Sequence, residues 1–298
     1  MCNQNTGKTR GYLLCGASVT DTHANGMSVV YHLQDGSFVI FDGGNSSVGE
    51  HLYNTLRELN GEGDIRVAAW IITHPHGDHF GGMCTMLNKG CPDVKVKEIW
   101  YNDINNWGAP LLKLWAEKLP DTPVRSFVLG DKVSVGEIDM QVISTPEAVI
   151  AYDENAFNVT DGSNNADVVY MLTIGGKKIL MSGDAGPVAW GFMMTNLDKY
   201  PIKCDYLQIP HHGVHNSGTD EAYAEIDPKH IVIPAGLVLA KRFTLETNKN
   251  VSAQSSYRLY KRMGVDMTYE TETDGKTYWF AGVYGNENSQ YVKKFFEI

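Results

Sequence analysis

The sequence predicts an α/β fold with two sheets and a pseudo-repeated half. Apolar or alternating runs of strand length recur along the 298 residues, and stretches with apolar residues at helical spacing lie between them. Histidine- and aspartate-rich motifs follow directly after several of these runs, at the place where α/β sheets usually carry their sites. With 43% hydrophobic residues, the chain can bury the core of one large domain.

The first half is expected to begin with strands and one helix. Gly11–Gly16, Ser28–Leu33 and Phe38–Phe41 alternate or run apolar, and Asp35-Gly36 predicts a hairpin turn between the last two. Leucines at helical spacing predict a helix over Val48–Leu59. The remaining expected strands are Val67–Ile72, Glu98–Tyr101, Ser126–Val128, Met140–Ile143, Val168–Thr173, Lys178–Ser182, Tyr206–Ile209, Ile231–Ile233, Met267–Glu270 and Thr277–Ala281. The remaining expected helices are Asp78–Leu87, Leu111–Leu119, Val188–Leu197 and Ser252–Met263, and Ser144–Asn165 is expected to be an irregular loop.

A cluster of metal-ligand residue types follows the buried strand at Val67–Ile72. Three histidines and one carboxylate lie within six residues: His74, His76, Asp78 and His79. A helix would scatter these side chains, whereas a tight turn through Pro75 and Gly77 can direct them to one point. Imidazole and carboxylate together favour zinc, with manganese or iron as alternatives. The stretch therefore predicts a metal site.

These residues form a pattern that resembles the His-x-His-x-Asp-His signature of the metallo-β-lactamase superfamily. Three further segments fit that family in order and spacing: Ser37–Gly44, Lys178–Asp184 and Tyr206–Gly213. The resemblance extends from about Gly11 to about Phe280. It implies a four-layer αββα sandwich, with residues 1–10 as a flexible N-terminal segment and residues 11–298 as a single domain.

Within the superfamily the chain is most similar to the ComEC-like branch, the hydrolase domain attached to the DNA-uptake competence channel. His79-Phe80-Gly81-Gly82 resembles its His-Ile-Gly-Gly, Asn164–Val169 resembles its Asn-Asn-x-Ser-Leu-Val, and Pro210–Ser217 resembles its Pro-His-His-Gly-Ser-x-x-Ser. Two departures matter. Met27 replaces a carboxylate, and no histidine lies between His79 and His211, where most superfamily hydrolases have one.

The resemblance implies a role for each candidate residue. His74 and His76 would hold the first metal with Asn165, for which Asn164 is the alternative. Asp78, His79 and His211 would hold the second metal, and Asp184 would bridge both. Two divalent ions can share a hydroxide that serves as the nucleophile, so Asp78 and its neighbours form the catalytic centre.

Three further residues are expected near this centre. Asp42 either accepts a hydrogen bond from a ligand histidine or ends its strand in a turn. His212 is expected to pack beside the ligands, because successive side chains diverge. His215 is expected either to protonate a leaving group or to be an exposed loop histidine.

Two classes of function remain open. The first is a dinuclear metal hydrolase that acts on a small phosphodiester or related ester. The alternative is a binding or regulatory metalloprotein with a degenerate site and no hydrolysis, which the missing histidine and Met27 favour. A redox member of the superfamily is a poorer choice, because such members carry a glutamate at the position of His76.

Charge and composition restrict partners and location. The net charge of −10 argues against a protein that binds long nucleic acid and favours a small-molecule substrate. No run is apolar enough to span a membrane, and residues 1–8 lack the apolar core of a signal peptide. These features, with five irregularly spaced cysteines that form no CxxC pair, favour free thiols and a cytoplasmic location. Cys2 leaves open a secreted or lipid-anchored protein whose leader has been removed.

Overall fold

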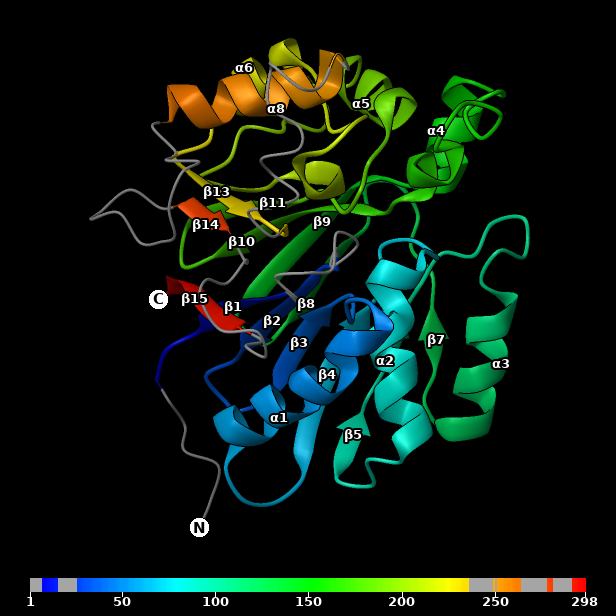
Figure 1. The fold of residues 1–298 in the computed structure, drawn as a ribbon, viewed down its shortest axis with the longest axis vertical. Coiled ribbons are helices and arrows are strands. Elements are labelled where there is room, and N and C mark those ends of the chain that lie inside the picture. The colour runs from blue at the N-terminus through cyan, green and yellow to red at the C-terminus, as the bar shows by residue number, and fades with distance from the viewer. Residues whose placement is uncertain (1–6, 16–25, 236–248, 250, 264–277, 281–290) are drawn as a thin grey trace.

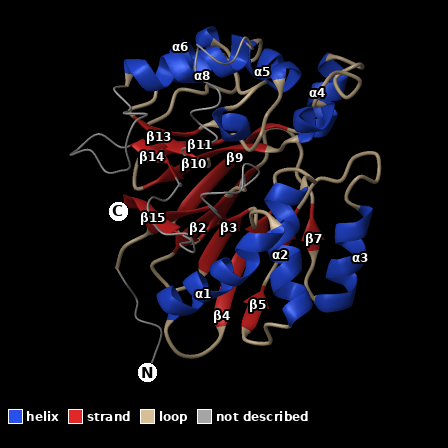
Figure 2. Cartoon of the chain, viewed as in Figure 1, coloured by secondary structure: helices blue, strands red, loops and turns tan. Residues whose placement is uncertain are grey.

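A computed structural model of the chain describes residues 7–15, 26–235, 249, 251–263, 278–280 and 291–298. Within these residues the strands form two sheets, one of eight strands and one of seven. Figure 1 shows the two sheets face to face in the middle of the molecule, with helices on the outer face of each. Figure 2 shows the same four layers coloured by secondary structure. The predicted αββα sandwich is confirmed.

The first sheet has the order β15-β1-β2-β3-β4-β6-β7, and β5 also pairs with β4. Its strands are β1 (Arg10–Cys15), β2 (Ser28–His32), β3 (Phe38–Phe41), β4 (Ile65–Ile71), β5 (Val94–Val96), β6 (Ile99–Trp100), β7 (Val124–Arg125) and β15 (Tyr291–Glu297). Neighbours from β3 to β7 are parallel. The helices of this half are α1 (Gly49–Asn60), α2 (Gly77–Lys89) and α3 (Ala109–Lys118), preceded by the 3-10 turn η1 (Ser46–Val48).

The second sheet has the order β14-β13-β12-β11-β10-β9-β8. Its strands are β8 (Lys132–Val135), β9 (Ile138–Ser144), β10 (Val169–Ile174), β11 (Lys177–Met181), β12 (Tyr206–Gln208), β13 (His230–Ile233) and β14 (Tyr278–Phe280). Neighbours from β11 to β14 are parallel. The helical elements of this half are α4 (Pro146–Tyr152), η2 (Gly162–Ala166), α5 (Pro187–Met194), η3 (Pro210–Gly213), α6 (Asp220–Ile226) and α8 (Val251–Arg262).

Three apolar layers hold the sandwich together. The middle layer lies between the sheets, where Phe41 of β3 meets Tyr170 of β10 edge to face, with ring centroids 5.7 Å apart. One outer layer packs helices such as α1, through Leu52 and Leu56, against the first sheet. The other packs α5, through Trp190, and its neighbours against the second sheet. Burial of these layers is the main driving force for the fold.

Several element predictions were wrong. The strand predicted at Ser126–Val128 instead occupies Val124–Arg125. The segment predicted as irregular, Ser144–Asn165, contains helix α4, whose N-cap Thr145 accepts a hydrogen bond from the Ala148 backbone N–H. Strands β5, β8 and β15 were not predicted. The strand predicted at Met267–Glu270 lies outside the described residues.

The first described residues of the chain pair with the last ones. Residues 1–6 of the predicted flexible segment lie outside the described residues, whereas Thr9 and Ile298 exchange two backbone hydrogen bonds of 2.7 and 2.9 Å. In the described ranges, no helix has the length and apolar content required to cross a bilayer.

Candidate metal centre

The polar residues of the site lie at the carboxyl ends of four strands, two from each sheet. Asp42 follows β3, and the segment from Thr73 to His79 begins two residues after β4 ends. Asp184 follows β11, and His211-His212 follows β12. Because β3 and β4 are parallel neighbours, as are β11 and β12, these loops meet at one edge of the sandwich.

The local backbone is specialised to bring the loops together. Asp42, His211 and His212 have positive φ values of 59°, 46° and 54°, which non-glycine residues adopt at an energetic cost. Helix α2 packs closely on the loop after β3, because a Cβ at Gly82 would overlap the carbonyl oxygen of Gly43. The N–H of Gly43 in turn donates to the carbonyl of His79. The fold therefore stabilises unusual conformations at the site.

Two groups of potential metal ligands share one carboxylate. The first group contains His74, His76 and Asp184, and within it one ligand atom from each residue lies within 4.8 Å of the others. The second group, which meets the same criterion, contains Asp78, His79, Asp184 and His212. Asp184 belongs to both groups, the arrangement expected of a bridging ligand.

The atoms that face the shared centre are buried without a hydrogen bond of good geometry. Among the described residues, no hydrogen bond satisfies Nε2 of His74, His79 or His212, or Oδ1 of Asp184. Burying such atoms without a partner destabilises a protein, so their arrangement around one point indicates that a bound ligand satisfies them. Imidazole nitrogen and carboxylate oxygen fit a divalent transition metal. The residues present therefore fit a two-metal centre.

The opposite ring nitrogens are held by the protein. Nδ1 of His79 lies 2.8 Å from Asp42 Oδ2, and Nδ1 of His212 lies 2.7 Å from the Pro234 carbonyl. Such contacts place the proton on Nδ1 and leave Nε2 free to bind a metal. Nε2 of His76 lies 2.6 Å from Ser163 Oγ, which leaves Nδ1 of that ring toward the centre. The predicted hydrogen bond between Asp42 and a histidine is thus present.

The cluster separates the pKa values of its histidines. Burial, and then the neighbouring His79, lower the pKa of His74 to about 4. Burial also lowers the pKa of His76 to about 4, with His74 contributing. Burial opposes the charged form of His212, but Asp184 and then Asp78 outweigh it and raise that pKa to about 10. Without metal, therefore, the positive charge of the centre resides on the rings nearest the carboxylates.

His212 occupies the position that the sequence prediction gave to His211. Nε2 of His212 lies 3.4 Å from both Asp78 and Asp184, and its side chain is 1% exposed. Nε2 of His211 lies 4.0 Å from Asp184, and its Nδ1 contacts the carbonyl of His215. The positive φ values of the pair direct the second ring inward, which residue spacing alone does not reveal.

The side chain of Asn165 makes hydrogen bonds to three backbone groups. Its Oδ1 accepts hydrogen bonds of 3.1 Å from the backbone N–H groups of Val188 and Ala189, at the start of α5. Its Nδ2 donates to the carbonyl of Ala156 at 2.7 Å. The amide therefore caps a helix and both of its polar groups are engaged in hydrogen bonds, which argues against the predicted ligand role for Asn165. The alternative, Asn164, is buried, and neither polar atom of its side chain has a hydrogen-bond partner within the described residues.

His215 lies at the rim of the centre. Its Nε2 is 2.8 Å from Asp161 Oδ2, and its ring centroid is 4.8 Å from that of His211. With 40% of its side chain exposed, it is accessible to a molecule that approaches the metals.

Four further residues contact the histidines of the site but were not predicted to do so from the sequence. Asp161 contacts His215, and Ser163, Thr73 and Asp167 contact ligand histidines. None of the four belongs to a recognisable metal-binding motif, so the sequence carried no signal for them.

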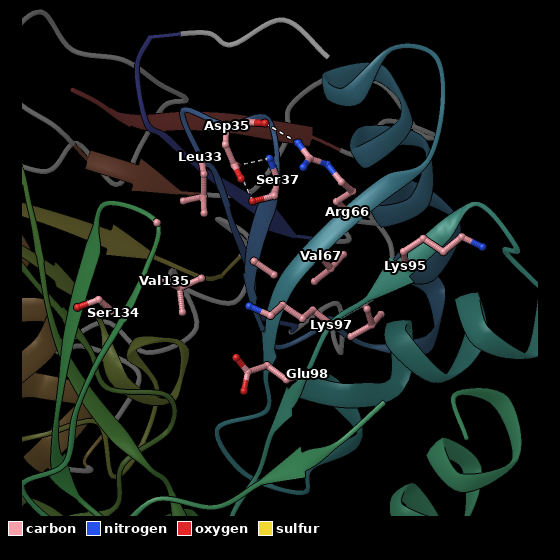
Figure 3. Close-up of a pocket in the computed structure, with 13 residues that line it drawn as sticks. Leu33, Asp35, Ser37, Arg66, Val67, Lys95, Lys97, Glu98, Ser134 and Val135 are labelled. Atoms are coloured by element: carbon pink, nitrogen blue, oxygen red, sulfur yellow. Dashed lines mark hydrogen bonds between the residues drawn. The ribbon is translucent and has the colours of Figure 1, made fainter. Parts of the chain in front are cut away.

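A separate cavity of about 420 Å³ lies at the opposite end of β4. Figure 3 shows it between Arg66 and Lys97 on one side and Ser134 and Val135 of the β8–β9 hairpin on the other. Its lining includes cations and the carboxylates of Asp35 and Glu98, but no residue of the metal centre.

Several solved structures are similar to this chain at low sequence identity. The metallo-β-lactamase fold protein YhfI from Bacillus subtilis is 11% identical, with a TM-score of 0.48 over 75% of this chain and 85% of that one. The subclass B3 metallo-β-lactamase MEM-A1, from a soil metagenome library, is 14% identical, with a TM-score of 0.44 over 86% and 90%. The diiron β-hydroxylase CmlA from Streptomyces venezuelae is 12% identical, with a TM-score of 0.47 over 83% and 49%. This chain thus spans about half the length of CmlA.

No curated protein sequence matches the chain significantly. A family model described as the metallo-beta-lactamase superfamily, in contrast, matches residues 22–230, which is more than half of the chain. The matched region contains the signature loop and all the clustered ligands. The chain belongs to the metallo-β-lactamase superfamily.

Proposed function

We propose that the chain is a dinuclear metal-dependent hydrolase. The observation that carries this proposal is the position of Asp184 in both ligand groups, surrounded by buried nitrogens that have no hydrogen bond of good geometry. His74, His76 and Asp184 would hold one ion. Asp78, His79, His212 and Asp184 would hold the other. Zinc suits this donor set best, and manganese or iron also fits.

The ions and the protein divide the chemistry between them. When bound, two divalent ions supply Lewis-acid charge and lower the pKa of coordinated water toward neutrality. The protein holds the ligand rings in the correct tautomer through Asp42 and the Pro234 carbonyl. We assign to His215, paired with Asp161, the donation of a proton to the leaving group at the exposed rim.

We propose a small phosphodiester or related ester as the substrate. The resemblance of three sequence segments to the ComEC-like branch, which is associated with nuclease chemistry, supports the phosphodiester. The net charge of −10 supports a small substrate rather than long nucleic acid. This is an inference from family resemblance, because one fold hosts many reactions. The same resemblance supports residues 11–298 as one domain.

The substrate proposal is tested with a panel of chromogenic phosphodiester, phosphomonoester, lactone and β-lactam compounds. The protein is loaded with zinc or with manganese, and Asp184→Asn is the control. We expect the phosphodiester to be hydrolysed fastest and the control to be inactive. Fastest turnover of a lactone or β-lactam would contradict the substrate class, and no turnover with two metals bound would contradict the enzyme assignment.

A binding or regulatory metalloprotein with one occupied site is the second candidate. The assignment of Asn165 to a helix cap favours it, because the group around His74 then contains only three clustered His or Asp residues among those described. Binding of a single equivalent of metal, without hydrolysis, would support this candidate.

A further inference from the structure

Asp167 lies on the side of His74 that faces away from the proposed metals. Its Oδ1 is 3.2 Å from Nδ1 of His74, and both side chains are 0% exposed. The other ring nitrogen of His74, Nε2, lies 4.0 Å from Asp184 Oδ2. The imidazole therefore lies between one carboxylate beside the centre and one carboxylate behind it.

The fold holds this second carboxylate in place. The backbone N–H of Val168 donates to the carbonyl of Thr73 at 3.1 Å, which fixes the chain next to His74. A Cβ at Gly183 would overlap Oδ1 of Asp167, so the glycine in the loop before Asp184 leaves the space that this oxygen occupies. The carboxylate is therefore positioned by two of the loops that also carry ligands.

The protein compensates the buried carboxyl of Asp167 only in part: burial and then the charge of Asp184 raise its pKa to about 8, although the Asp184 backbone N–H and the Thr73 hydroxyl favour the charged form. Within the described residues, neither of its oxygens has a hydrogen bond of good geometry. Its Oδ1 lies 3.2 Å from Nδ1 of His74, and Thr73 Oγ1 lies 3.2 Å from the same nitrogen. A buried carboxylate of this kind destabilises a protein unless positive charge is nearby. A metal ion on Nε2 of His74 would polarise the ring and strengthen its Nδ1–H as a donor to Asp167.

We propose that Asp167 is a positioning residue for the first metal. It holds the proton of His74 on Nδ1, keeps Nε2 available as a ligand, and adds negative charge behind the group of His74, His76 and Asp184. Asp42 does the same for His79 in the second ligand group. Each group thus has its own buried carboxylate. This inference rests on the proposed two-metal centre.

The pair of carboxylates provides a matched experiment. Metal-free wild type, Asp167→Asn and Asp42→Asn are titrated with zinc against a chromophoric chelator, and anomalous diffraction locates the bound ions. We expect Asp167→Asn to weaken the site at His74 and His76 by roughly 10- to 100-fold and to leave the other site within about twofold. Asp42→Asn should weaken the site at His79 instead.

A second readout separates positioning from a purely structural role. Asp167→Asn replaces a buried carboxyl with a neutral amide of the same shape, so the unfolding temperature of the metal-free protein should stay equal or rise, although metal binding weakens. Should the asparagine variant fail to fold, Asp167→Ser provides the same test. Unchanged zinc affinity at the His74 site, or an equal loss at both sites, would overturn the role of Asp167. Wild type that binds no metal would overturn the proposed function together with it.

Discussion

The clustered histidines have different protein groups behind their rings. His79 contacts the carboxylate of Asp42, His212 contacts a backbone carbonyl, and His74 lies beside Asp167. These partners decide which ring nitrogen faces the centre, and their charge tunes how strongly that nitrogen binds a metal. The chemistry of the site is thus controlled as much by what lies behind the rings as by the rings themselves.

The adjacent histidines give a direct test of the geometry. We expect His212→Ala to lose one of the two metals, because Nε2 of His212 lies 3.4 Å from both Asp78 and Asp184. His211→Ala should retain both metals, since its ring points to the carbonyl of His215. Metal content of the two variants after dialysis checks this. The reverse pattern would restore the original assignment of His211.

Metal binding should release protons. The nearby carboxylates overcome burial and raise the pKa of His212 to about 10, so the metal-free ring is protonated at neutral pH and must lose that proton to a metal. Zinc affinity should therefore rise with pH. Calorimetric titration in two buffers of different ionisation enthalpy measures the protons released, and His212→Gln is the control. Equal heats in both buffers would contradict the protonated state.

The same pKa shift affects the stability of the metal-free protein. The folded-state pKa of His212 lies above its ordinary value of 6.5. Its protonated ring therefore stabilises the fold fully below about pH 6.5, and this contribution is lost as the pH rises through about 10. We expect the unfolding temperature of the metal-free wild type to decline over that window more steeply than that of His212→Gln. Parallel declines would show that another group is responsible.

At the scale of elements, helix α5 depends on one side chain. Oδ1 of Asn165 accepts from the N–H groups of Val188 and Ala189, and its Nδ2 satisfies the Ala156 carbonyl. Asn165→Ala should lower the free energy of unfolding by about 1–3 kcal/mol, because a cap is lost and buried polar groups lose their partner. Metal content should be unchanged. Denaturant unfolding and metal analysis check both, and loss of a metal with normal stability would restore Asn165 as a ligand.

Long, strongly patterned elements could be predicted from the sequence. The leucine spacing of α1 and the apolar run of β4 correspond to elements of nearly the predicted extent. The misses have physical causes. Strand β8, with the sequence Lys-Val-Ser-Val, is a half-exposed edge strand, and β5 is three residues long, so neither has a strong hydrophobic pattern. Helix α4 begins at the Thr-Pro start signal of residues 145–146, which the polar composition of the loop obscured.

The site was predictable where ligands are adjacent in the sequence. The signature loop and Asp184 follow strands directly, and the structure brings them together. The choice between His211 and His212 depends on two positive φ values, and the role of Asp167 depends on contact with a residue 93 positions earlier in the chain. Neither property leaves a local pattern in the sequence.

At the scale of the whole molecule, net charge restricts the substrate. With a net charge of −10, few phosphates of a long nucleic acid would be neutralised by side chains, so we expect weak binding with little salt dependence. Labelled single- and double-stranded DNA is titrated at two salt concentrations, with Asp184→Asn to block catalysis. Tight binding that collapses as salt rises would instead indicate a nuclease for polymeric DNA.

The central claim is a two-metal centre bridged by Asp184. The most direct test is the metal content per chain of wild type and Asp184→Asn after incubation with excess zinc or manganese and removal of free metal. The account predicts about two equivalents for wild type and a clear loss in the variant, because one carboxylate serves both ions. About one equivalent or less in wild type, or two tightly bound metals in Asp184→Asn, would contradict it.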